Sequence, residues 1–169
     1  MRMLVPMMLV GLIVAGCGKV ALEAEVVERA ALEQHNFVAV LSGGEEVPPN
    51  DSRARGQASF QLSRDGTELS YRLIVANIEN VTQAHIHMAP VGANGPVVAW
   101  LYPDSPPSQL VPGRFQGVLA EGTITDADLV GALAGAGLSA LLDVLRAGDA
   151  YVNVHTVQYP PGEVRGQIR

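Results

Sequence analysis

The chain has 169 residues, a formal net charge of −6 and 48% hydrophobic residues. This length suits one ordinary domain with an additional segment and leaves little room for two. An acidic chain with no cluster of lysine or arginine argues against nucleic acid as a partner, and against electrostatic attraction to anionic lipid.

The first sixteen residues have the pattern of a secretory signal. Arg2 supplies a short positive region, and Leu4 to Val14 form an apolar stretch too short to cross a bilayer as a helix. The sequence VAGC follows and ends at Cys17, which resembles the lipobox of bacterial lipoproteins. The resemblance implies cleavage before Cys17 and a diacylglyceryl group on its sulfur. Removal of residues 1–16 takes away Arg2 and changes the net charge from −6 to −7.

A lipid on Cys17 would tether the protein to a membrane of the cell envelope, because two acyl chains anchor a protein stably. Cys17 is the only cysteine, so an intramolecular disulfide is impossible. The alternative is an ordinary signal with an incidental cysteine. Gly18, in place of the aspartate that retains lipoproteins at the inner membrane, favours the outer membrane and periplasm in a Gram-negative cell. Residues 17–35 then serve as a tether.

From Asn36 onward, short strands are separated by turns rich in glycine and proline. Apolar and polar residues alternate in most of these segments, as in half-buried strands. Arg64 to Thr67 is expected to form a hairpin turn. About eight strands at this spacing predict a β-sandwich or a barrel. The expected strands are 37–41, 54–62, 69–75, 81–88, 97–102, 115–124, 151–157 and 163–168.

One helical insertion is expected at about 125–147. Thr125 can cap its start, with acidic residues in the first turn. Four leucines then follow at helical spacing, and Gly148 is a suitable C-terminal stop. Glycines at 135 and 137 are expected to divide the insertion into two pieces. The four leucines are Leu138, Leu141, Leu142 and Leu145.

Three of the four histidines lie on two expected strands. His85 and His87 share one face of a strand, because residues two apart point the same way. His155 shares a face with Tyr151 and Asn153. If the two strands are neighbours, about 4.8 Å apart, the three imidazoles can converge. They would then form a metal site for copper or zinc, completed by water or a carboxylate. The candidate carboxylates are Glu163, Glu45 and Glu46.

The same residues allow other interpretations. The histidines can instead be members of a structural hydrogen-bond network, or respond to pH. Glu163 and Arg165 alternate onto one face and can form an ion pair. Neither HExxH, nor GxSxG, nor a P-loop occurs, and no convincing acid–base pair is present. We therefore expect no enzymatic activity.

Four blocks of sequence resemble the CHRD domain, which occurs in chordin and in many bacterial proteins. The resemblance covers residues 36–169 and implies an extracytoplasmic all-β fold, an immunoglobulin-like or superoxide-dismutase-like Greek-key β-sandwich. It supplies no defined reaction. The HIH strand is similar to the copper-binding strand of copper–zinc superoxide dismutases, but too few histidines and no disulfide are available for dismutase activity. The blocks are LSGGEEVPP at 41–49, AHIH at 84–87, YVNVHT at 151–156 and PGEVRGQI at 161–168.

Two functions are therefore expected. The first is a lipid-anchored, non-catalytic binding or structural module of the envelope, whose loops Gly43–Asp51 and Pro90–Pro96 would meet an envelope protein or polysaccharide. The second is a copper- or zinc-binding protein that uses the three histidines.

Overall fold

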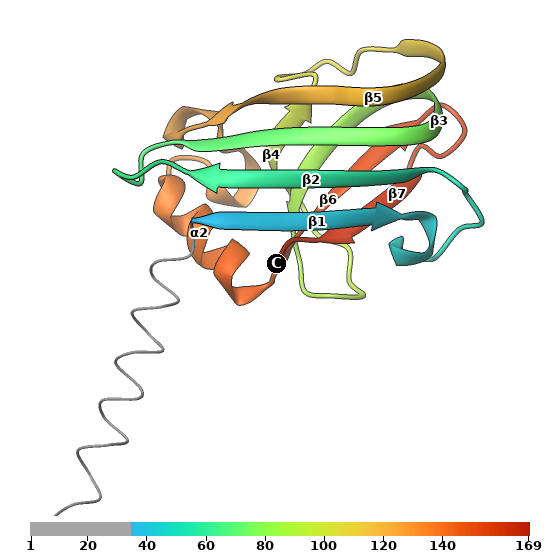
Figure 1. The fold of residues 1–169 in the computed structure, drawn as a ribbon. Helices are drawn as coiled ribbons and strands as arrows, with labels where there is room; N and C mark the ends of the chain where they lie inside the picture. Colours follow the sequence, from blue (N-terminus) through green and yellow to red (C-terminus); the bar gives the residue numbers. More distant parts are fainter. Residues whose placement is uncertain (1–34) are drawn as a thin grey trace, which may run out of the picture. The chain divides into compact units, whose positions relative to one another are not determined.

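The structure, a computed structural model, describes residues 35–169 (Figure 1). The expected signal, the lipidation site at Cys17 and nearly all of the tether lie outside the described residues. No helix between His35 and Arg169 is long and apolar enough to cross a membrane. The elements are β1 (Asn36–Ser42), η1 (Gly43–Glu45), β2 (Arg55–Leu62), β3 (Leu69–Met88), β4 (Val97–Tyr102), β5 (Val111–Ile124), η2 (Asp126–Asp128), η3 (Gly131–Leu133), α2 (Leu138–Ala147), β6 (Ala150–Thr156) and β7 (Val164–Gln167).

The described strands form an antiparallel barrel with two additional strands. The closed ring runs β2-β1-β7-β6-β3, and β3 pairs again with β2. The contact between β1 and β7 is short: Ser42 pairs with Arg165, and Val38 exchanges two backbone hydrogen bonds with Arg169. Strands β4 and β5 both pair with β3 outside this ring. The mostly β fold with a short helix is confirmed, and of the sandwich and the barrel that the strand spacing predicted, the five ring strands form the barrel, which differs from the Greek-key sandwich that the family resemblance implies.

The length of β3 explains this difference. The sequence predicts two strands, 69–75 and 81–88, but the structure has one strand of 20 residues. Its first part pairs with β2 and β5, and its last part pairs with β6 and β4. Asn77 and Asn80 have φ of 55° and 54°, and the register with β5 shifts around them. These residues bend the strand without ending it, since a bulge increases local bending and twist. One continuous strand therefore belongs to both sides of the barrel.

The hydrophobic core follows the alternation of the strands. In the last part of β3, Ala84 and Ile86 are fully buried in the core, and their neighbours on β6, Val152 and Val154, are equally buried. Because successive side chains point to opposite faces of a sheet, the residues between them point to the other face. Val164 of β7 joins the same core. The face opposite to Ile86 therefore remains for polar side chains.

The expected helical insertion is confirmed in outline. Thr125 donates its backbone N–H and its hydroxyl to Asp128, which starts the 3-10 turn η2. The helix α2 ends at Gly148, whose φ of 73° lies in the left-handed region that glycine adopts without strain. The four leucines at helical spacing are all buried. Burial of this apolar stripe accounts for the packing of α2 on the rest of the domain.

Candidate metal centre

The pairing of β3 with β6 brings the three histidines onto one face. His85 lies opposite Asn153, His87 lies opposite Tyr151, and His155 lies opposite Gln83. Ile86 points into the core, as the alternation of the strand requires. The predicted convergence is therefore confirmed. We call His85, His87 and His155 the histidine cluster.

The nitrogen atoms of the histidine cluster are close enough to hold one ion. One ligand nitrogen from each ring lies within 4.8 Å of the other two. His85 Nδ1 and His155 Nε2 are 3.2 Å apart. Two nitrogens bound to one tetrahedral zinc ion at about 2.0–2.1 Å would be about 3.3 Å apart, which is nearly the same separation. This pair therefore already has the spacing of two ligands of one ion, whereas the other nitrogen pairs, up to 4.8 Å apart, must move closer to reach the same ion.

Two backbone carbonyls fix the protonation of the rings. His87 Nδ1 lies 2.9 Å from the carbonyl oxygen of Gly95, and His155 Nδ1 lies 2.9 Å from that of Pro160. A carbonyl only accepts, so Nδ1 of each ring must carry the proton, and Nε2 keeps its lone pair. Metal-binding histidines commonly donate their second nitrogen to a carbonyl in this way. His85 then donates from Nδ1 to His155 Nε2 in the metal-free protein, and with an ion bound it would carry its proton on Nε2.

Burial keeps the rings neutral. The exposed fractions are 3% for His85, 8% for His87 and 6% for His155. Desolvation, together with the neighbouring His155 and His87, lowers the pKa of His85 to about 3. Desolvation also lowers the pKa of His87 and of His155, although the carbonyls of Gly95 and Pro160 act in the opposite direction. Neutral imidazole is the form that binds metal ions, so little proton competition is expected at neutral pH.

Several buried acceptor atoms next to the cluster have no hydrogen-bond partner. They include His87 Nε2, Asn153 Oδ1 and Glu46 Oε1. The side chain of Asn153 faces His87 and raises the pKa of that ring against the effect of burial. Leaving one buried polar group without a partner costs roughly 1–3 kcal/mol. A group of such atoms in one place is expected where an ion or water normally binds.

A cation–aromatic stack supports His87. The ring of Tyr151 stacks on His87 with centroids 4.8 Å apart and an angle of 8°. The guanidinium carbon of Arg165 lies over the Tyr151 ring, 3.4 Å from its centroid. Arg165 also donates to Asn94 Oδ1 at 3.1 Å and to the carbonyl of Ala93 at 2.8 Å. The stack therefore joins the 89–96 loop to the ligand strand.

The candidate carboxylates lie in three different environments. Glu45 is exposed, whereas Glu46 is buried. Glu46 and Asn153 both lie against Gly162, because a Cβ added to Gly162 would meet the side chains of these two residues. Desolvation raises the pKa of Glu46 to about 7, although Arg165 and the Val47 backbone lower it. Glu163 is buried, and its Oε1 accepts from Ser52 at 2.6 Å. Among residues 35–169, only one group of potential ligand side chains is close enough to share a metal ion, and it consists of the three histidines. None of the three carboxylates belongs to it.

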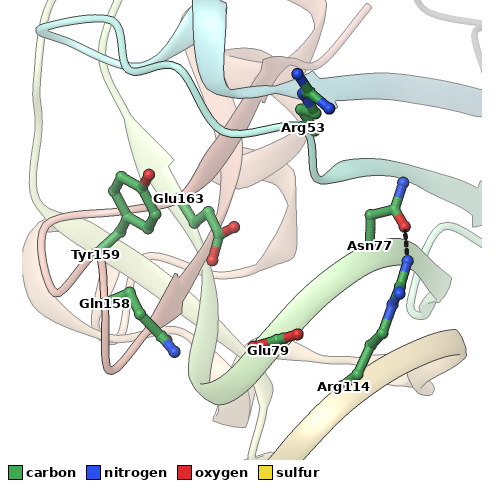
Figure 2. A pocket seen from close by; sticks show the side chains of 7 residues that line it. All are labelled: Arg53, Asn77, Glu79, Arg114, Gln158, Tyr159 and Glu163. Carbon is green, nitrogen blue, oxygen red and sulfur yellow. Dashed lines mark hydrogen bonds between the residues drawn. The ribbon is translucent and has the colours of Figure 1, made fainter.

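The expected ion pair between Glu163 and Arg165 does not form. The two residues lie on β7 or just before it, but Glu163 is bonded to Ser52, whereas Arg165 is bonded to the 89–96 loop. Glu163 instead lies at a separate open pocket of about 440 Å³. Figure 2 shows the residues around this pocket, with Arg114 hydrogen-bonded to Asn77. They are Arg53, Asn77, Glu79, Arg114, Gln158, Tyr159 and Glu163.

Several residues around the centre carry no signal in the sequence. The carbonyls of Gly95 and Pro160 belong to loops, and a backbone carbonyl can come from any residue type, so the sequence does not mark them. Trp100 of β4 packs edge-on against His85, with centroids 4.3 Å apart, and only strand pairing brings it there. Asn153 and Tyr151 could be found from the alternation of their strand, since they share a face with His155.

The described chain is thus a small β-barrel domain with a buried three-histidine centre that could hold a metal ion. The sequence pattern of the CHRD domain matches residues 37–168, and the protein belongs to this family. No curated protein gives a significant match to the chain, and no solved structure does so either.

Proposed function

We propose that this CHRD domain binds one copper or zinc ion through His85, His87 and His155. The observation that carries the proposal is the convergence of three neutral imidazoles, two of which have their lone pairs fixed toward the centre by backbone carbonyls. Imidazole nitrogen is a preferred ligand of both ions. A purely structural network would pair these nitrogens with donors, but His87 Nε2 has none.

The experiment uses the full chain with Cys17→Ser in mild detergent, so that no thiol competes for metal. Dialysis against Cu²⁺ or Zn²⁺, followed by elemental analysis, is expected to give one ion per chain. Trp100 is the only tryptophan and adjoins His85, so Cu²⁺ is expected to quench its fluorescence, whereas Zn²⁺ is not.

The matched control is His35→Ala, which removes the one exposed histidine outside the cluster and is expected to leave binding unchanged. His85→Gln, His87→Gln and His155→Gln are each expected to lose the ion, and a metal-free melting curve of each variant checks that it folds. Equal binding by the wild type and these variants would refute the proposal.

We further propose that the domain works in the cell envelope, attached to a membrane by lipid on Cys17. The support is the signal pattern of residues 1–16 and the small residues before the cysteine. Labelling of cells with a fatty acid, followed by fractionation, is the test. The wild type is expected to carry label in the membrane fraction, and Cys17→Ser is expected to lose both label and attachment.

A second candidate function is binding of an envelope polysaccharide. The polar pocket supports it, because two arginines, two carboxylates, two amides and Tyr159 offer both donors and acceptors for hydroxyl groups. Its volume lies within the range of small-ligand sites. Arg53→Ala and Glu79→Gln are expected to weaken binding of envelope oligosaccharides in a titration, whereas Arg64→Ala, on an exposed hairpin, is not.

A further inference from the structure

Asn153 has the position of a ligand. It lies on β6 between Tyr151 and His155, on the face that carries the histidine cluster, and directly across from His85. Only 3% of its surface is exposed. A buried amide needs partners for both its oxygen and its nitrogen. Asn153 Oδ1 has no partner, which makes it an exception that requires a physical reason.

The surroundings fix the direction of the amide. Asn153 Nδ2 donates to the carbonyl of Pro161 at 3.4 Å, and it lies with Glu46 Oε1 against Gly162. The Pro161 carbonyl only accepts, so it favours the NH₂ group over the oxygen on its side. The reversed orientation would place Oδ1 against this carbonyl oxygen. Oδ1 therefore points away from it.

The oxygen and a histidine nitrogen are then two acceptors without a donor. His87 Nε2 keeps its lone pair because Nδ1 donates to Gly95, and neither Nε2 nor Asn153 Oδ1 has a hydrogen-bond partner. His87 pairs with Tyr151 and His85 pairs with Asn153, so Asn153 and His87 are diagonal neighbours on the same face of the two strands. Two buried acceptors that face one site without a donor fit a cation between them better than any neutral group of the protein.

We propose that Asn153 Oδ1 is the fourth ligand, which completes a closed site of three nitrogens and one oxygen. This inference rests on the proposed metal binding by the histidine cluster. Four protein ligands leave no position for water, whereas a catalytic zinc site keeps one open. The domain would therefore hold its ion without exposing it to small exogenous ligands.

The test uses Co²⁺ as the probe, in the full Cys17→Ser chain, because its visible spectrum reports coordination. Azide is then added to the loaded protein. The wild-type spectrum is expected to stay unchanged by azide. Asn153→Ala is expected to bind Co²⁺ at least about tenfold more weakly and to show an azide-dependent spectrum, because water replaces the lost oxygen. Asn153→Asp keeps an oxygen and is expected to remain insensitive to azide.

Asn50→Ala is the matched control, since Asn50 is a nearby amide whose nitrogen donates to the carbonyls of Gly162 and Glu163 and whose Oδ1 already accepts from the backbone N–H of Ser52. It is expected to behave like the wild type. Melting of each metal-free variant shows whether it is folded. An azide response in the wild type, or no azide response in folded, loaded Asn153→Ala, would overturn the role of Asn153 alone. Failure of the wild type to bind Co²⁺, Cu²⁺ or Zn²⁺ would overturn the proposed function as well.

Discussion

Glu46 offers a direct measurement of the electrostatics around the centre. Its side chain is buried, and desolvation raises its pKa from the ordinary value of 4.5 to about 7, even though Arg165 acts in the opposite direction. The native state therefore holds this proton more tightly than the unfolded chain does. Stability from the protonated carboxyl is fully present below pH 4.5 and is lost as the pH rises to about 7. Above that pH the cost of burying the charge is constant.

The magnitude follows from the two pKa values. At 1.36 kcal/mol per pH unit, the difference between 4.5 and about 7 corresponds to at most about 3.4 kcal/mol. Solvent screening reduces this limit, and we expect about 2 kcal/mol. Glu46→Gln is uncharged at every pH and removes the effect. The variant should therefore become more stable than the wild type by about that amount between pH 4.5 and 7.5.

The assay is urea unfolding of the metal-free Cys17→Ser chain, with and without Glu46→Gln, at half-unit steps from pH 4 to 8. The difference between the two free energies of unfolding is the measured quantity, because the titration of the histidine cluster is common to both chains and cancels. Glu68→Gln, on an exposed turn, is the control for loss of a carboxylate outside the core. A flat or falling difference for Glu46→Gln would refute the reasoning.

Three further predictions concern the same domain. Burial lowers the pKa of His85 to about 3 and also lowers those of the other two cluster histidines. In the Glu46→Gln background, where the opposing gain from Glu46 is absent, the metal-free protein should therefore lose stability as the pH falls below 6.5, and saturating Zn²⁺ should oppose the loss at pH 6; a Tm independent of Zn²⁺ there would contradict this. Gly162→Ala should lower the free energy of unfolding in urea by at least about 2 kcal/mol, because Gly162 has a φ of 139° and a Cβ there would lie 2.5 Å from Glu46 Oε1. Gly135→Ala is the control: it also has a positive φ but lies in open space, so it should lower that free energy by only about 1 kcal/mol. Leu141→Ala, at a fully buried position of α2, should cost about 2–5 kcal/mol, and a loss below about 1 kcal/mol would show that the helix does not pack as described.

The sequence by itself determined the local elements and the faces of the ligand strands. Alternation predicted that His85 and His87 share a face and that Ile86 opposes them, and the structure confirms both. Capping and leucine spacing predicted the start of the insertion and the buried stripe of α2. These features depend on the repeat of a strand or helix, which is local and needs no knowledge of distant residues.

The tertiary structure decided how the strands close and what surrounds the cluster. The sequence predicted separate strands at 69–75 and 81–88, but strand pairing on both sides carries β3 through the bend at Asn77 and Asn80 and makes one barrel. The carbonyls of Gly95 and Pro160 became partners of the histidines only through loop packing. Spacing along the chain predicts which way a side chain points, whereas the atoms that it meets depend on contacts between segments far apart in sequence.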